Sequence, residues 1–310
     1  ALILILAILF RDFQKLGIVL AFSIAYFIPI IFLFFKTKDK LGIIISRFQL
    51  RISTIKEYVK KGFSTAIIAA SFAFLTWIDA SILGAFSTYE NVASYSIAGS
   101  IANVIASVPL SVMHFTLTRS ASVKSEEKSR LILSRTIRLS YFFSLMFALL
   151  ITSLIFLITA IFFPKYKGIE IFVAILSSGL VFYSVYNLIA AFLIGRLRQE
   201  QTIFPIFVAA LFNIIFDIIL IPKFGLYGIT IATLFAHLLA FVLLAPKVGM
   251  KSTIPIIIAT PALLFLSYYL GFYGILVIPL SIPLLMFLNL ITKDDILITL
   301  DTVRRIFRPA

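Results

Sequence analysis

The sequence predicts an all-α fold, a bundle of helices that cross a membrane, and three observations support this prediction. First, apolar residues make up 62% of the 310 residues and charged residues only 13%, and the mean hydropathy is +1.13. Ordinary soluble domains contain about 25% charged residues. Second, the apolar residues gather in runs close to the ~20 residues that a helix needs to cross a hydrocarbon core of ~30 Å. Third, Lys and Arg are concentrated in alternate connections between these runs.

Nine apolar runs have the length of a membrane span. In chain order they are residues 17–35, 63–86, 92–117, 139–163, 169–194, 204–221, 226–245, 254–270 and 273–290. A tenth run, residues 1–10, is about half as long, and no basic segment precedes it as in a signal peptide. We interpret it as the end of a helix. The chain has no cysteine, so disulfides and thiolate metal sites are excluded.

The distribution of basic residues predicts the orientation. Of the 27 Lys and Arg, all but Arg11, Lys15, Lys165, Lys167 and Lys223 fall in one set of alternate connections. Cytoplasmic loops carry the excess of Lys and Arg, so we expect a multi-pass protein of the cytoplasmic membrane with its C-terminus in the cytoplasm. Contact of these loops with anionic membrane lipids also accounts for the net charge of +14, and nucleic acid is not an expected partner.

Two charged segments are predicted to lie on the membrane surface. In the connection 36–61, Phe48, Ile52, Ile55 and Val59 recur at helical spacing among basic residues. This pattern is typical of an interfacial amphipathic helix, and a simple charged tether is the alternative. The C-terminal segment 293–310 has a similar apolar stripe.

The span 92–117 carries one polar face. Its members are three or four residues apart and are Ser96, Ser100, Asn103, Ser107, Ser111 and His114. This spacing places them on one side of a helix over about five turns. Pro109 removes a backbone hydrogen bond, so we expect a bend or a hydrated break there. We interpret the face as the wall of a water-lined cavity, with hydrogen bonding between helices as the alternative.

Other spans add isolated polar groups to the predicted cavity. The candidate lining residues are Tyr183, Asn187, Thr230, Thr233 and His237, the last of these expected to be neutral and hydrogen-bonded. Asp79, Asn213 and Asp217 are predicted to lie at similar depth near the outer surface. Their oxygens are candidates for binding a coupling Na⁺ or H⁺, because hard oxygen donors suit a small cation. The alternative is that each aspartate is hydrated or hydrogen-bonded locally near its helix end.

Several short motifs resemble a known family. Residues 213–233 contain Asn213 and Asp217, the turn LIPKFGLYG and the helix start GITIAT, and Asp79 precedes Leu83-Gly84 and the sequence VASY at 92–95. Together these features resemble the polysaccharide and lipid-linked oligosaccharide flippases of the MATE-like (MOP) transporter superfamily. The resemblance extends over residues 55–245, the C-terminal portion of such a protein.

The resemblance implies two six-helix bundles around a central cavity and transport by alternating access. Residues 1–35 would then end an incomplete first bundle, 36–61 would form a cytoplasmic connection, 62–247 the second bundle, 252–292 an extra helix pair and 293–310 a cytoplasmic tail. The rest of the first bundle would be supplied by a longer chain or by a separate subunit. Related flippases often carry there the cavity arginines that hold a lipid pyrophosphate, whereas the spans of this chain contain only His114 and His237 as basic groups.

The function predicted from these observations is a flippase that moves lipid-linked saccharide or polysaccharide precursors, with no cofactor other than a coupling ion. A cation-coupled multidrug exporter of the same fold is the main alternative, favoured by the acidic residues. A membrane-embedded glycosyltransferase or polymerase is less expected, because the sequence has no HxxxH, DxD or DDxxD cluster. Asp294 and Asp295 are predicted to cap the tail helix. A membrane scaffold without transport activity is a further alternative.

Overall fold

The computed structural model describes residues 17, 20, 23–25, 27–37, 52–123 and 125–297, without the side chains at 52–58, 60–61, 64–65, 108–109 and 111. The chain divides into two compact units, Ala1–Lys60 and Lys61–Ala310. In the first unit residues 27–37 are helical; they overlap the predicted span 17–35 and extend two residues beyond it. The run 1–10, most of the connection 36–61 and the tail beyond 297 lie outside the described residues.

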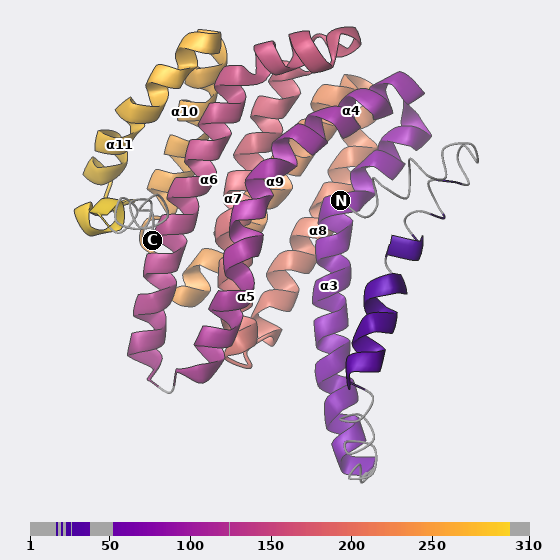
Figure 1. Ribbon diagram of the computed structural model, residues 1–310, viewed down its shortest axis with the longest axis vertical. Helices are drawn as coiled ribbons and strands as arrows, with labels where there is room; N and C mark the ends of the chain where they lie inside the picture. Colours follow the sequence, from indigo (N-terminus) through magenta and orange to yellow (C-terminus); the bar gives the residue numbers. More distant parts are fainter. Residues whose placement is uncertain are drawn as a thin grey trace. The chain divides into compact units, whose positions relative to one another are not determined.

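The described part of the second unit is helical throughout, with no strand (Figure 1). In chain order the helices are α3 (Ile52–Phe86), α4 (Tyr89–Ala102), η2 (Asn103–Ala106), α5 (Ser107–Ser122), α6 (Glu126–Phe162), η3 (Pro164–Tyr166), α7 (Glu170–Gly195), α8 (Glu200–Phe224), α9 (Leu226–Leu244), η4 (Ala245–Val248), α10 (Thr253–Leu270), η5 (Gly271–Leu276) and α11 (Val277–Phe287). The helices α3 to α9 cover the residues of the predicted second bundle, with α3 beginning before it, and α10 and α11 fall within the residues of the predicted extra pair.

Six segments in the described part are long and apolar enough to cross a membrane, judged by length and composition. They contain seven of the nine predicted spans, because one of them, Thr253–Phe287, joins α10, η5 and α11. The span 92–117 is not among them because it is broken into α4, η2 and α5. The number of nine spans therefore stays a prediction. Residues 52–61, expected in a separate connection, continue without a helix break into the rest of α3.

The break in the span 92–117 lies at η2, one turn before Pro109. An α-helix would pair the N–H of residue 109 with the carbonyl of Ile105, and proline has no N–H. The chain tightens there into a 3₁₀ turn, in which the N–H of Ser107 bonds to the carbonyls of Val104 and Ile105. The α-helical hydrogen-bond pattern is therefore interrupted within a turn of the proline.

The helix α7 forms the centre of the second unit. It contacts α4, α5, α6, α8, α9 and α10, and it is the most buried of the membrane-length helices. In Figure 1 it lies between α6 and α9. Phe182 on α7 stacks on Phe241 of α9, with ring centroids 5.8 Å apart. Gly195 at its end is so close to α5 that a Cβ atom would collide with the Ser120 hydroxyl.

The helices α8 and α9 form a tight antiparallel hairpin, with the turn inside the motif LIPKFGLYG. Gly225 between them has a φ of +54°, a conformation that glycine adopts without steric cost. Gly228 in the first turn of α9 packs directly against α8, and an added Cβ would lie 2.5 Å from the Leu220 carbonyl oxygen. The two glycines therefore allow the close approach that brings polar side chains of both helices together.

Candidate functional site

Four helices contribute to a cluster of polar side chains around Asp79. One carboxylate oxygen of Asp79 on α3 accepts a hydrogen bond from Asn213 Nδ2 on α8 at 2.6 Å. Its other oxygen accepts bonds from the Tyr95 hydroxyl on α4 at 2.6 Å and from the Thr233 hydroxyl on α9 at 2.8 Å. Asn213 Nδ2 also donates to Asp217 Oδ2, one helical turn along α8, at 3.1 Å. One amide nitrogen therefore joins two carboxyl groups.

This cluster is buried and has no basic partner. Asp79 is 3% exposed, and Asn213 and Asp217 are fully buried. Among the described residues, no Lys, Arg or His forms an ion pair with either aspartate. Buried carboxylates are stable only when they are paired, protonated or bound to a cation.

Two oxygen atoms in the cluster have no hydrogen-bond partner. They are Asn213 Oδ1 and Asp217 Oδ1, both on α8 and both buried. Such atoms are uncommon in folded proteins, because each costs about 1–3 kcal/mol of desolvation when left unpaired. Oxygen donors of this kind suit Na⁺, and a carboxylate can also take up H⁺. No group of three or more His, Cys, Asp or Glu side chains that could hold a metal occurs in the described part of the chain.

A cavity of about 420 Å³ lies next to the cluster and is bounded by α3, α4, η2, α5, α7 and α9. Its volume is in the range of small-molecule binding sites. The polar and aromatic residues of its wall are Thr76, Trp77, Asp79, Tyr95, Ser96, Ser100, Asn103, Tyr183, Thr233 and His237. Asn213 and Asp217 do not line it. They lie behind the wall and are connected to the cavity through Asp79.

Another part of the cavity wall is aromatic; it is formed by Tyr183 and His237, which pack against Tyr186. The Tyr186 hydroxyl and His237 Nδ1 are 2.9 Å apart, and the ring of Tyr183 lies edge-on to both side chains. Phe72 stacks on Tyr186, with ring centroids 5.9 Å apart. His237 is thus hydrogen-bonded and 4% exposed, as expected from its position in the middle of a span.

Several predicted lining residues lie outside the cavity wall. His114 is exposed, Asn187 is buried in α7, and Thr230 bonds to the carbonyl of Leu226 on its own helix. Ser107 bonds to the Val104 carbonyl, and the side chain of Ser111 lies outside the described residues. The predicted polar face therefore lines the cavity only as far as Asn103.

The sequence did not indicate two residues of the site, Tyr95 and Tyr186. Each lies directly before a residue that was selected, Ser96 and Asn187 respectively. A tyrosine in an apolar span usually packs with its ring and bonds through its hydroxyl, so its sequence neighbourhood gives little indication of function. The VASY motif that ends in Tyr95 was the available signal.

These observations define a multi-pass helical membrane protein with a buried acidic cluster beside a cavity. No protein-family model matches the chain. An uncharacterized membrane protein of Methanocaldococcus jannaschii is 34% identical over 86 residues, which are 28% of this chain and 17% of that protein.

A solved structure of the lipid II flippase MurJ, in an inward closed conformation, has a similar fold. The match has a TM-score of 0.59 at 20% sequence identity and covers 93% of this chain. The match spans 65% of the flippase chain. The fold expected from the resemblance to MATE-like flippases is confirmed by this match.

Proposed function

We propose that this chain belongs to a flippase that moves a lipid-linked saccharide across the cytoplasmic membrane by alternating access. The observation that carries the proposal is the cavity, whose wall includes the Asp79 carboxylate, in a fold similar to that of a lipid II flippase. The polar strip of Ser96, Ser100 and Asn103 would face the saccharide head group. The C-terminus would lie in the cytoplasm. No covalent step is involved.

A coupling ion would bind at Asp79, Asn213, Asp217 and Thr233. The support is the burial of two carboxyl groups without a basic partner, together with the two unpaired oxygens on α8. Because Asp79 also belongs to the cavity wall, loss of the ion would change the charge that the substrate meets. Na⁺ and H⁺ both fit these oxygen donors.

We further propose that a first helical bundle completes the transporter, either in a longer chain or as a separate subunit. The match covers 65% of the flippase chain, which leaves room for such a bundle. The helix α3 supports this proposal, because it is among the less apolar spans and yet is mostly exposed in the second unit. Its exposed residues include Ser81, which is poorly suited to face lipid.

The second candidate function is a cation-coupled exporter of cationic compounds. It is favoured by the cavity wall, which contains an aspartate and no Lys or Arg. The discriminating experiment uses vesicles that contain the chain together with its first bundle. Translocation of a fluorescent lipid-linked sugar is expected, and efflux of a cationic dye without it would favour the exporter.

Asp294→Asn is the matched control for the ion-site variants in these vesicles, since Asp294 is exposed and remote from the cavity wall. Translocation that is unchanged in both Asp79→Asn and Asp217→Asn, and unaffected by Na⁺ or pH gradients, would remove the coupling ion from the proposal.

A further inference from the structure

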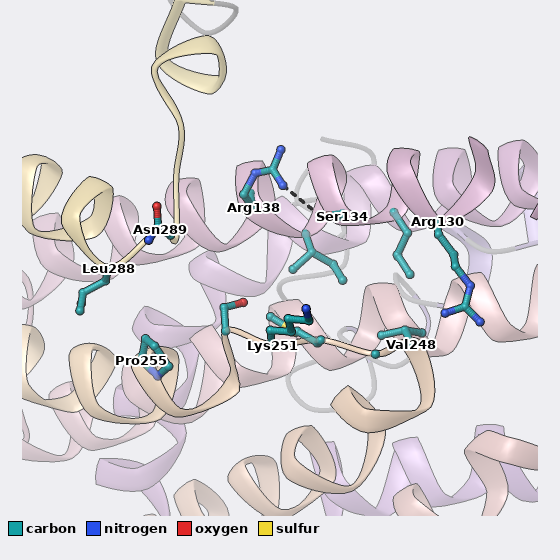
Figure 2. A pocket seen from close by; sticks show the side chains of 13 residues that line it. Arg130, Ser134, Arg138, Val248, Lys251, Pro255, Leu288 and Asn289 are labelled. Atoms are coloured by element: carbon teal, nitrogen blue, oxygen red, sulfur yellow. Dashed lines mark hydrogen bonds between the residues drawn. The ribbon is translucent and has the colours of Figure 1, made fainter. Parts of the chain in front are cut away.

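A second cavity, of about 450 Å³, is lined by α6 and has a basic wall (Figure 2). It is formed by the first turns of α6, the connection between α9 and α10, and the end of α11. Its polar lining residues are Arg130, Ser134, Arg138, Lys251, Ser252 and Asn289. Its apolar lining includes Leu133, Ile137 and Pro255. No residue of this cavity belongs to the acidic cluster or to the cavity beside it.

The basic cavity lies at the level of lipid head groups. The helix α6 has 37 residues, which at 1.5 Å per residue gives about 56 Å, far more than the ~30 Å hydrocarbon core. Its charged residues all lie between Glu126 and Arg138, and the following 24 residues are uncharged. The charged turns therefore extend beyond the hydrocarbon, on the side that holds most of the Lys and Arg of the chain.

The cavity has an excess of positive charge. Arg130 pairs with Glu126 at 3.2 Å, but the same carboxylate also pairs with Arg196 at 2.9 Å and Arg198 at 3.1 Å. Lys251 is exposed and has no acidic partner among the described residues. Only Arg138 is balanced by one acid, Asp295, at 2.9 Å.

We propose that this basic cavity binds the phosphodiester head group of an anionic phospholipid of the cytoplasmic leaflet. Basic pockets between helix ends on the cytoplasmic side suit such head groups, and Arg and Lys supply the donors that phosphate oxygens need. Ser134, Ser252 and Asn289 add neutral hydrogen-bonding groups. The apolar side chains of Leu133, Ile137 and Pro255 provide the surface for the start of the acyl chains. This proposal is independent of the transported substrate.

The double variant Arg130→Gln/Lys251→Gln tests the proposal. Both side chains are exposed, and Glu126 keeps Arg196 and Arg198 as partners, so the fold is expected to remain intact. The matched control is Lys165→Gln/Lys167→Gln, which removes the same charge from exposed residues at the opposite end of the spans. The measurement is a native mass-spectrometry titration of the purified chain in detergent with phosphatidylglycerol, phosphatidylcholine or inorganic phosphate, after thermal unfolding has shown that each variant is folded.

We expect the chain to bind phosphatidylglycerol in preference to phosphatidylcholine. The double variant should bind phosphatidylglycerol roughly 30-fold more weakly, the single variant Lys251→Gln about 5-fold more weakly, and the control should be unchanged. Equal binding of the two lipids, or an equal loss in the control, would overturn the proposal. Inorganic phosphate that binds as tightly as the lipid would overturn the assignment to a lipid head group.

Discussion

At the scale of single residues, Asp217 is the most direct test of the proposed ion site. Asp217→Asn keeps the shape of the side chain and removes its charge. If Na⁺ binds at this site, it stabilises the folded protein by about 2.7 kcal/mol at 100 times its dissociation constant, and the variant should lose this stabilisation. The measurement is thermal unfolding in NaCl and in choline chloride. Asp294→Asn, at an exposed carboxylate, should respond to Na⁺ as the unmodified chain does.

Asp79 should behave differently, because its two oxygens accept hydrogen bonds from three side chains. Asp79→Asn replaces one acceptor with an amide that donates, so one donor in the cluster loses its partner. We expect a loss of about 1–3 kcal/mol in the free energy of unfolding even without Na⁺. Unfolding in Na⁺-free buffer measures this loss. Equal stability of the two variants there would contradict the role of Asp79 as the acceptor at the centre of the cluster.

The sequence predicted part of this site for a physical reason. Ionisable and amide groups in an apolar span are costly, so Asp79, Asn213 and Asp217 could be selected individually, and the loop charges placed Asp79 and Asp217 at similar depth. Asn213 links the two carboxyl groups by hydrogen bonds. This link depends on the close packing of α3, α8 and α9, which no sequence pattern specifies. Tyr95 was missed for the same reason, since its role follows from the position of α4 relative to Asp79.

At the scale of elements, Gly228 controls the packing of α8 on α9. Gly228→Ala places a Cβ atom 2.5 Å from a backbone oxygen of α8, so the two helices must separate. We expect a destabilisation of about 1–3 kcal/mol, measured by thermal unfolding.

The control for this prediction is Gly84→Ala on α3, where the nearest atom is 3.8 Å away. The added methyl group fits there, and alanine is favoured over glycine inside a helix. Gly84→Ala should therefore be neutral or stabilising. Equal effects of the two substitutions would show that close approach at Gly228 is unimportant.

The polar face of the span 92–117 shows why residue spacing alone does not predict which side chains line the cavity. A 3₁₀ turn advances 120° per residue and an α-helix 100°, so the four residues of η2 rotate the following face by about 80°. Ser96 and Ser100 precede this rotation, Asn103 is the first residue of η2, and all three line the cavity, whereas His114 follows the rotation and does not. Pro109 indicated a break but could not indicate how far the face would turn.

The contact between α6 and the C-terminal segment should depend on pH. Burial opposes ionisation of Asp295, but hydrogen bonds from Arg138 and Thr292 outweigh it, so the pKa of this carboxyl is lowered. The contact therefore contributes its full stability above the unfolded-state pKa of about 3.9 and loses it as pH falls through the lower folded-state value. We expect Asp295→Asn to reduce the loss of stability between pH 5 and 3, measured by thermal unfolding. Asp294→Asn should retain it.

At the scale of the whole molecule, the predicted orientation can be tested directly because the chain contains no cysteine. Single cysteines at Lys223 and Lys247 lie at opposite ends of the α8–α9 hairpin, and both positions are exposed. In intact cells, a membrane-impermeant maleimide should label Lys223→Cys and leave Lys247→Cys unlabelled until the membrane is permeabilised. The reverse pattern would invert the topology and would move the basic cavity to the outer surface.

The sequence predicted the class of fold well, because composition and run length alone distinguish membrane helices from soluble ones. It could not predict which helix lies at the centre. In a membrane, lipid-facing helices are the most apolar, and α7 is both the least apolar of the membrane-length segments and the most buried. Small and polar residues such as Ser177, Ser178 and Gly179 allow neighbouring helices to pack closely on it. These small and polar residues indicate a central helix only once the helices that pack against α7 are known.

The central position of α7 has a consequence for exchange with solvent. Its amides are enclosed by six other helices, so their hydrogens can be replaced by deuterium only when the whole second unit opens. The amides of α4 and η2, beside the cavity and the helix break, need only a local opening. Deuterium uptake should therefore be slowest in α7 and fast in residues 99–106. The difference between the two rates would show whether the helices beside the cavity can open while α7 stays folded.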